Sequence, residues 1–201
     1  MSASISPPVT DLGAALARAV DEYRDHANIG LLLSRLDELA GSATPDALVV
    51  AVEPFRDIPE VAGPIYERVV VAQPQNARAL VILANAYWLS GRGPDVVGDL
   101  AGRAIAADPG NRGAWHLWAL TESDPRHRVT RWQQVAARFP DDDLALASVA
   151  DNAASLAGAE HDTDALVLAI ATYEQLLART DQLAQREALE NALMTLRAWK
   201  L

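Results

Sequence analysis

Two short stretches of the chain carry nearly the same pattern, Pro-Glu-Val-Ala-Gly at 59–63 and Pro-Asp-Val-Val-Gly at 94–98. In both cases another proline follows 15 residues after the first, and a third pair of prolines further along has the same spacing. Proline fits the first turn of a helix, where its missing N–H has no intrahelical partner, and a later proline forces the chain out of helical geometry. The spacing therefore predicts three equivalent helices of three to four turns. The proline pairs are Pro59 and Pro74, Pro94 and Pro109, and Pro125 and Pro140.

A second kind of helix is predicted before each later proline-led helix. Residues 80–87 follow the pattern Leu-x2-Leu-Ala-x2-Tyr, and residues 115–119 and 146–150 repeat its start. In the proline-led helices, apolar residues also recur at helical spacing. These positions are Ala62, Tyr66 and Val69, then Val97, Ala101 and Ala104, then Val129, Trp132 and Val135.

These patterns together resemble the tetratricopeptide repeat, whose signature is Trp-x2-Leu-Gly-x2-Tyr, then Ala-x3-Phe, then Pro, at a period of 34. The resemblance is clearest over 58–140. Two departures stand out: four residues are missing between Asn111 and Pro125, and alanine (Ala84, Ala119, Ala150) replaces the family's small glycine. Four residues is close to one helical turn, so a helix can lose them and keep its buried face in register.

The resemblance implies an all-α fold, a right-handed superhelical solenoid of about ten helices stacked as antiparallel pairs. We expect a disordered N-terminus over 1–9 and a single repeat domain over 10–201. Within it, divergent N-terminal helices (10–57) precede the core repeats (58–140), and a C-terminal repeat with a capping helix (141–201) follows. A loop is expected around residues 156–163, before the last two helices.

Composition limits the functions that the chain can have. The formal net charge is −10, which repels phosphate backbones, so we expect no nucleic acid partner. There are no cysteines, which excludes disulfides and thiolate metal sites. We see no signal peptide and no membrane-spanning stretch, and expect a cytoplasmic protein. Abundant alanine, with arginine in place of all but one lysine, hints at a GC-rich bacterial genome.

The resemblance also implies which residues line the concave groove. In this family the first helix of each unit faces the groove, which holds a partner peptide. Carried onto this sequence, the groove positions include Arg78, Asn85, Trp88, His116 and Asp151. Asn85 matches a clamp asparagine of chaperone-binding members, but the matching cation positions are not cationic here, so chaperone-tail binding is not expected. The tryptophans at 115, 118 and 132 fall on core positions, whereas Trp88 is expected at the groove edge.

Three further clusters have a functional and a structural interpretation. Arg126, Arg128 and Arg131 form a candidate docking patch for an acidic partner, or else a solvated helix start balanced by nearby carboxylates. The acidic and histidine residues at 160–164 suggest metal ligands, but they lack metal-site spacing and precede a helix, where acids cap free N–H groups. Residues 91–93 are glycine-rich like a phosphate-binding loop, but they lack its lysine and the dinucleotide fingerprint, so these glycines are expected to end a helix.

Taken together, the sequence predicts a non-catalytic adaptor or assembly factor that binds a protein or peptide in its groove, with no cofactor and no metal. An alternative is a structural protein that self-associates, for example as a homodimer. A less favoured alternative is a small-ligand or catalytic site in the groove around His116, for which Asp151 would supply the second polar group.

Overall fold

The computed structural model describes the backbone of residues 9–200 and the side chains of residues 12–200. The expectation of disorder over 1–9 falls outside this range except at Val9, which is the first residue of a helix.

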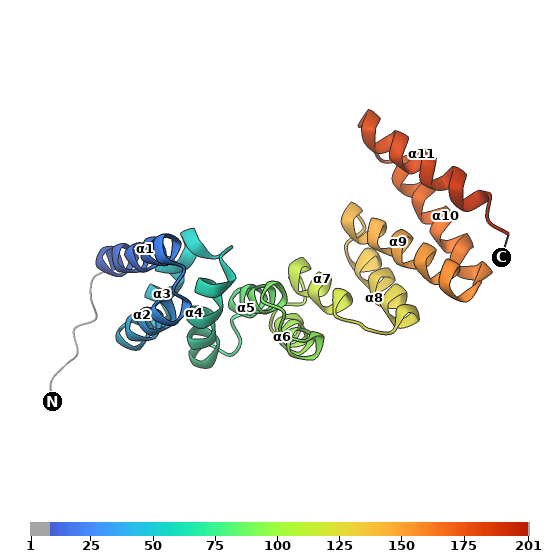
Figure 1. The fold of residues 1–201 in the computed structure, drawn as a ribbon. Helices are drawn as coiled ribbons and strands as arrows, with labels where there is room; N and C mark the ends of the chain where they lie inside the picture. Colours follow the sequence, from blue (N-terminus) through green and yellow to red (C-terminus); the bar gives the residue numbers. More distant parts are fainter. Residues whose placement is uncertain (1–8, 201) are drawn as a thin grey trace. The chain divides into compact units, whose positions relative to one another are not determined.

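Over the described residues the chain is all-α, with eleven α-helices, one short 3₁₀ helix and no strand (Figure 1). None of these helices combines the length and apolarity needed to cross a bilayer. The elements are α1 (Val9–His26), α2 (Ile29–Ser42), α3 (Pro45–Val52), η1 (Glu53–Phe55), α4 (Pro59–Ala72), α5 (Ala77–Leu89), α6 (Pro94–Ala107), α7 (Arg112–Leu120), α8 (Pro125–Arg138), α9 (Asp143–Glu160), α10 (Thr163–Leu177) and α11 (Leu183–Arg197).

The proline spacing predicts the three equivalent helices correctly. Helices α4, α6 and α8 each begin at the expected proline and each contain 14 residues. The eighth residue of each helix, which is Tyr66, Ala101 or Trp132, is buried. The apolar positions at helical spacing therefore do form the buried face.

The helices that alternate with them differ in length. Helix α5 has 13 residues whereas α7 has nine, so the four residues missing before Pro125 come out of α7. The three small residues expected at close helix contacts, Ala84, Ala119 and Ala150, are fully buried. Alanine thus serves where the family prefers glycine, because a methyl group still lets two helices approach closely.

The described chain divides into two compact units, residues 1–117 and residues 118–201. In unit 1, α1 packs on α2 and α3, and α4 packs on α2, α3 and α5, which also packs on α6. In unit 2, α9 packs between α8 and α10, and α10 also packs on α11. That all of 10–201 acts as a single repeat domain stays a prediction.

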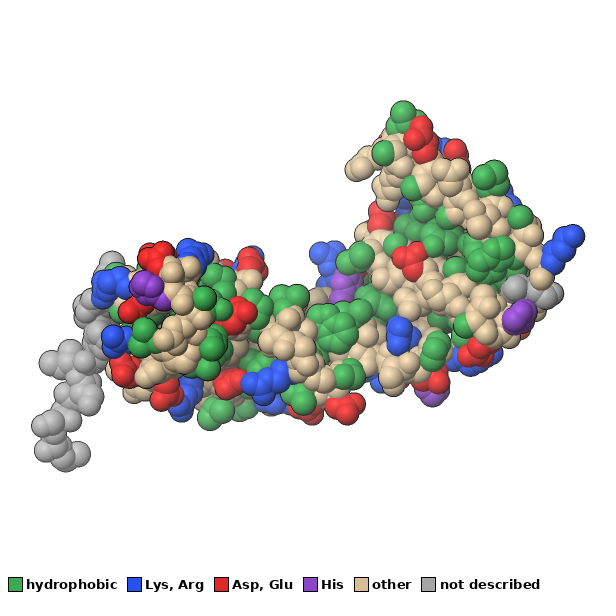
Figure 2. Space-filling view, viewed as in Figure 1, with side chains coloured by type: hydrophobic (Ala, Val, Ile, Leu, Met, Phe, Trp, Pro, Cys, Tyr) green, Lys and Arg blue, Asp and Glu red, His purple; other side chains and the backbone are tan. Residues whose placement is uncertain are grey.

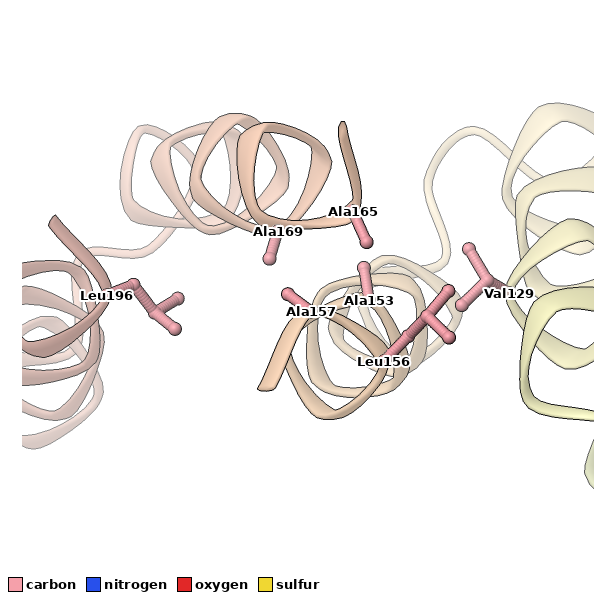
Figure 3. Close-up of a cluster of buried hydrophobic side chains, with 7 residues drawn as sticks. All are labelled: Val129, Ala153, Leu156, Ala157, Ala165, Ala169 and Leu196. Carbon is pink, nitrogen blue, oxygen red and sulfur yellow. The ribbon is translucent and has the colours of Figure 1, made fainter. Parts of the chain in front are cut away.

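The core of unit 2 is built largely from small side chains. Alanines on α9 and α10 face one another, with Leu156 and Val129 filling the space toward α8 and Leu196 contributed by α11 (Figure 3). Alanine has the highest helix propensity and costs no side-chain entropy on burial, so such an interface is compatible with long, closely packed helices. The alanines are Ala153, Ala157, Ala165 and Ala169.

The prediction of a loop around residues 156–163 is wrong. Helix α9 continues to Glu160, and only His161 and Asp162 connect it to α10. The segment is rich in alanine, which favours helix, and its glycine, Gly158, lies under the ring of Trp199. His161 adopts a left-handed conformation with φ of 54°, which ends the helix without a glycine.

Candidate functional site

A polar pocket lies in unit 1 beside α5. Its volume is about 340 Å³, and both Arg78 and Asn85 from the predicted groove set line it. The other lining residues come from α5, from the turn after η1 and from the start of α7; they are Arg56, Asp57, Val81, Ile82 and Asn111. We call this the polar pocket.

Two arginines of the polar pocket converge on one carboxylate. Arg78 Nη2 donates to both carboxylate oxygens of Glu53 at 2.8 Å, and Arg56 Nη1 donates to Glu53 Oε1 at 2.9 Å. Arg56 Nε also lies 3.7 Å from Asp57 Oδ1. These carboxylates hold the two guanidinium groups in place and balance their charge.

A buried hydroxyl lies within the electrostatic field of the same cluster. The side chain of Tyr66 is only 1% exposed, and its hydroxyl has no hydrogen-bond partner among the described residues. Burial raises the pKa of Tyr66, and the negative charge of Glu53 raises it further. Tyr66 therefore stays protonated, and its unpaired O–H reduces the free energy gained by burying the ring.

The structure brings together only part of the predicted groove set. Trp88 lies one turn beyond Asn85 on α5 and is 37% exposed, so it is not a core residue; that it lies at the edge of a groove stays a prediction. His116 lies half-buried on α7 and, like Trp88, is not among the residues that line the polar pocket. Asp151 belongs to unit 2 and is exposed.

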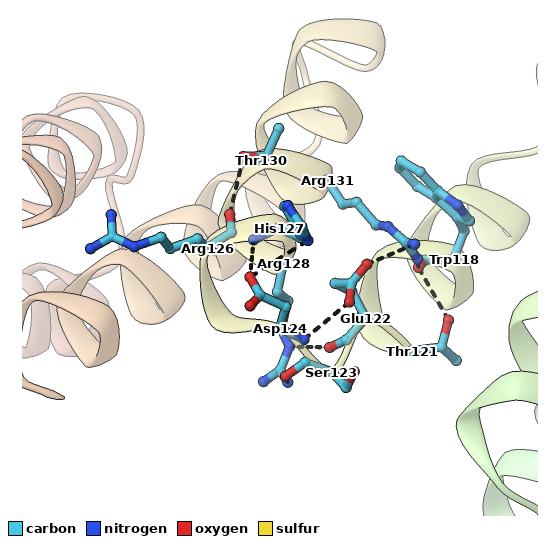
Figure 4. A network of polar contacts seen from close by, with 10 residues as sticks. All are labelled: Trp118, Thr121, Glu122, Ser123, Asp124, Arg126, His127, Arg128, Thr130 and Arg131. Carbon is cyan, nitrogen blue, oxygen red and sulfur yellow. Dashed lines mark hydrogen bonds and ion pairs between the residues drawn. The ribbon is translucent and has the colours of Figure 1, made fainter. Parts of the chain in front are cut away.

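The basic cluster at the start of α8 is held by acidic and carbonyl groups of its own unit. Arg126 lies 2.6 Å from both Glu160 and Asp162. Arg128 Nε donates to the Glu122 carbonyl at 2.6 Å, and Arg131 lies 2.7 Å from the Glu122 carboxylate (Figure 4). These contacts agree with the second interpretation of the cluster, in which arginines at the start of a helix balance nearby carboxylates. That the cluster also docks an acidic partner stays a prediction.

Backbone groups stabilise the carboxylates in this network. A hydrogen bond from the Asp124 N–H is the main cause of the lowered pKa of Glu122. Asp162 caps α10 by accepting from Asp164 N and Ala165 N at 3.0 Å, and this backbone bonding, followed by Arg126, lowers its pKa. The capping interpretation of 160–164 is therefore correct, and no group of acidic or histidine side chains among the described residues could hold a metal ion.

The core assignment of the tryptophans is correct for one and wrong for two. Trp132 is 5% exposed, but Trp115 and Trp118 are only half-buried. The Trp115 indole N–H donates to the Pro109 carbonyl at 3.0 Å, and the Arg131 guanidinium lies 4.5 Å from the centre of the Trp118 ring. A polar N–H needs an acceptor, and a ring face attracts a cation, so both side chains lie where these partners are available.

A second candidate site, which the sequence patterns do not indicate, lies in unit 2 between α9, α10 and α11. This aromatic cleft has a volume of about 420 Å³ and is bordered by Tyr173 and Trp199. It is also lined by Ala154 and Ser155 of α9 and by Asn191, Ala192, Thr195 and Leu196 of α11. Tyr173 belongs to α10 and Trp199 follows α11, so only the packing of these helices brings the two rings to one cleft.

The folds of solved tetratricopeptide proteins are similar to this one. A crystal structure of MamA protein superposes with a TM-score of 0.58 at 15% identity, covering 87% of this chain and 98% of that chain. A thermophilic tetratricopeptide protein of Thermus thermophilus, TTC0263, gives a TM-score of 0.54 at 16% identity, covering 91% and 99%. No family model matches the sequence, and no curated protein is detectably similar to it. The chain has the tetratricopeptide-like repeat fold.

Proposed function

We propose that this chain is a non-catalytic protein-interaction module, an adaptor or assembly factor that holds a segment of a partner polypeptide. The observation that carries the proposal is the polar pocket, in which Arg78 and Asn85 lie together as the family resemblance implies. The tetratricopeptide-like fold supports such a role at a general level, because repeats of this kind leave continuous surfaces whose side chains are free to vary.

The chemistry of the polar pocket suits a peptide backbone. Arg78 is held by Glu53, so it is preorganised, and the exposed Asn85 side chain carries both a donor and an acceptor. Val81 and Ile82 add apolar surface between these polar groups. We propose that Asn85 bonds to the partner's main chain while Trp88, one turn away, is the aromatic anchor.

The test is affinity capture from extract of the source organism. The bait is the wild-type chain, compared with a triple variant, Asn85→Ala, Trp88→Ala and His116→Ala. A matched control replaces three exposed apolar residues of the same unit, Val50→Ala, Val71→Ala and Val96→Ala. We expect a partner that the wild type and the control retain and that the triple variant loses while remaining helical by circular dichroism.

Other outcomes count against the proposal in different ways. If all three baits retain the same partner, binding does not use these residues, and the patch at Arg126, Arg128 and Arg131 becomes the candidate. If none retains a partner, the adaptor function is wrong for that extract, and self-association or a small ligand near His116 takes its place.

One observation favours self-association as a second candidate function. A cavity of about 740 Å³ lies between α10 and α11, and its lining includes Leu177, Leu193 and Met194. Met194 is 66% exposed, so it adds apolar surface to this cavity that a second copy of the chain can cover. A dimer at micromolar concentration in sedimentation equilibrium, dissociated by Met194→Lys, would establish this function, whereas a monomer under the same conditions would exclude it.

A further inference from the structure

The aromatic cleft of unit 2 is an apolar surface with a defined charged edge. Hydrophobic side chains gather over α9–α11 in the space-filling view (Figure 2). None of the eight residues that line the cleft is charged. Its small side chains, Ala154 and Ala192, leave room between the two larger aromatic ones, Tyr173 and Trp199.

Helix α9 accommodates the side chain of Trp199 at a glycine, Gly158. A Cβ atom added at Gly158 would lie 3.3 Å from Cη2 and 3.4 Å from Cζ3 of the indole ring, so the absence of a side chain there lets the ring approach α9 closely. The ring is nevertheless 37% exposed. The ring of Trp199 therefore contacts α9 at Gly158 and still offers exposed aromatic surface to a ligand.

A carboxylate without a cation lies at the edge of the cleft. The hydroxyl of Tyr173 donates to Asp151 Oδ1 at 2.5 Å, which positions the carboxylate beside the aromatic ring. Burial, and then this hydrogen bond, raise the pKa of Tyr173, so the tyrosine remains the donor. No described arginine, lysine or histidine forms an ion pair with Asp151, in contrast to Glu160 and Asp162, which share Arg126.

The charge around the cleft therefore favours a cationic ligand. The chain carries a net charge of −10, and the exposed carboxylate of Asp151 lies next to the Tyr173 ring. Aromatic faces and a carboxylate both attract guanidinium and ammonium groups. The volume of about 420 Å³ is too small for a whole amphipathic helix but suits a few residues of an extended chain.

We propose that the aromatic cleft binds an extended segment of a partner polypeptide in which an apolar residue adjoins an arginine or lysine. The apolar side chain lies between Tyr173 and Trp199, and the cation lies against Tyr173 and the carboxylate of Asp151. The exposed amide of Asn191 on α11 donates to a main-chain carbonyl of the segment. The inference rests on the proposed peptide-binding function, to which it adds a second site and the chemistry of the ligand.

The test measures peptide affinity by fluorescence polarisation with the full chain. Three labelled, end-blocked octapeptides serve as probes: alternating leucine and arginine, alternating leucine and glutamate, and alternating serine and arginine. We expect the leucine–arginine peptide to bind at least about tenfold more tightly than either of the others, since only it supplies both the apolar contact and the charge.

Variants separate the cleft from the general acidity of the protein. Asp151→Asn is expected to weaken the leucine–arginine peptide by about tenfold. Asp181→Asn, which removes the same charge from an exposed turn of the same unit, should change its affinity by less than about twofold, given screening by salt. Trp199→Ala should weaken it by about tenfold, while Tyr173→Phe, which keeps the ring and the charge of Asp151, should stay within about threefold.

Three results would overturn the inference. They are equal affinity for the arginine and glutamate peptides, equal effects of Asp151→Asn and Asp181→Asn, and no binding of any peptide up to millimolar concentration. None of them decides the proposed function, which the capture experiment with the unit 1 variants tests separately. A partner that depends on Asn85 and Trp88 but not on Asp151 would leave the adaptor function standing and remove only the aromatic cleft from it.

Discussion

The two units differ in the residue type that caps the N-termini of their helices. In unit 1, three helices are capped by asparagine, whose side-chain oxygen accepts from a backbone N–H three residues further on. In unit 2, three helices are capped by aspartate in the same geometry. The asparagines are Asn28, Asn76 and Asn111, and the aspartates are Asp124, Asp142 and Asp162.

The difference shows what charge adds to a cap. Amide and carboxylate caps satisfy the same orphan N–H groups, but only the carboxylate interacts with the positive end of the helix dipole and attracts cations. Asp162 accordingly holds Arg126 as well as capping α10. In unit 2 a capping residue, Asp162, is therefore also a member of the ion-pair network. In unit 1 the arginine cluster is centred on Glu53, a residue of η1.

The largest expected effect comes from the equivalent buried positions of the proline-led helices. Trp132 of unit 2 is 5% exposed and is the largest side chain at this position, so Trp132→Ala should lower the free energy of unfolding by about 3–5 kcal/mol. Urea denaturation followed by circular dichroism measures it. A loss below about 1 kcal/mol would mean that the site collapses around the missing ring or that Trp132 is not packed as described.

The next effect separates the two kinds of cap by pH. Backbone hydrogen bonds lower the pKa of Asp124 and Asp162 in the folded protein relative to about 3.9 for an unfolded aspartate. A lowered folded pKa means that the stability these groups add is present above pH 3.9 and is lost as the pH falls through their folded pKa values. The asparagine caps of unit 1 do not titrate.

The double variant Asp124→Asn and Asp162→Asn tests this acid sensitivity. It keeps the capping oxygens but loses the charges, so it should be less stable than wild type at pH 7 and should lose less stability on acidification. Urea midpoints at pH 7 and at about pH 3 give the comparison. Parallel losses in the wild type and the double variant would show that other carboxylates dominate the acid response.

A smaller effect tests the asparagine caps directly. Asn76→Ala removes the acceptor for Ala79 N at the start of α5 and should cost about 1 kcal/mol in the free energy of unfolding. Asn76→Asp should restore the cap at pH 7 and at the same time make unit 1 sensitive to acid. If Asn76→Asp is as unstable as Asn76→Ala at pH 7, Asn76 stabilises the fold through its amide N–H group, which donates to Gln73 Oε1, and not through the capping oxygen.

The smallest effect is a gain in stability. Tyr66→Phe removes a buried hydroxyl that has no partner among the described residues and keeps the ring, so the free energy of unfolding should rise by up to about 1 kcal/mol. The position is equivalent to Trp132, so the two variants test the same place in two proline-led helices. A loss of stability in Tyr66→Phe would show that the hydroxyl is hydrogen-bonded, for instance through water.

The repeat architecture was predictable because it rests on local rules. Prolines at 59, 94 and 125 start helices by removing an N–H that the first turn does not need, and this needs no knowledge of tertiary contacts. The loss of four residues from α7 was also visible as a shortened interval. The loop expected at 156–163 does not form, because α9 runs through Gly158, and the ring that covers this glycine comes from Trp199, more than 40 residues later.

The candidate sites were predictable only in part. The family pattern indicated Arg78 and Asn85, which the structure places in one pocket, because both lie on one face of the same helix. It did not indicate Arg56, which lines that pocket from the turn after η1, or Glu53 of η1, which pairs with Arg56 and Arg78. It also did not indicate Tyr173 and Trp199, which border a cleft formed by three helices. Contacts between elements distant in sequence leave no periodic signal.

By itself, the sequence determined the three proline-led helices, their starts and their buried faces, since proline geometry and apolar spacing act within a few residues. The tertiary structure decided which charges on different helices are paired, whereas pairs such as Arg56 and Glu53 lie only three residues apart in the chain. In the folded chain Arg126 forms ion pairs with Glu160 and Asp162. Asp151 accepts a hydrogen bond from the Tyr173 hydroxyl and forms no ion pair with a described cation. An ion pair forms only between charges that lie within a few ångströms of each other in space. For side chains on different helices, that distance is set by the way the helices pack and cannot be read from their separation along the chain.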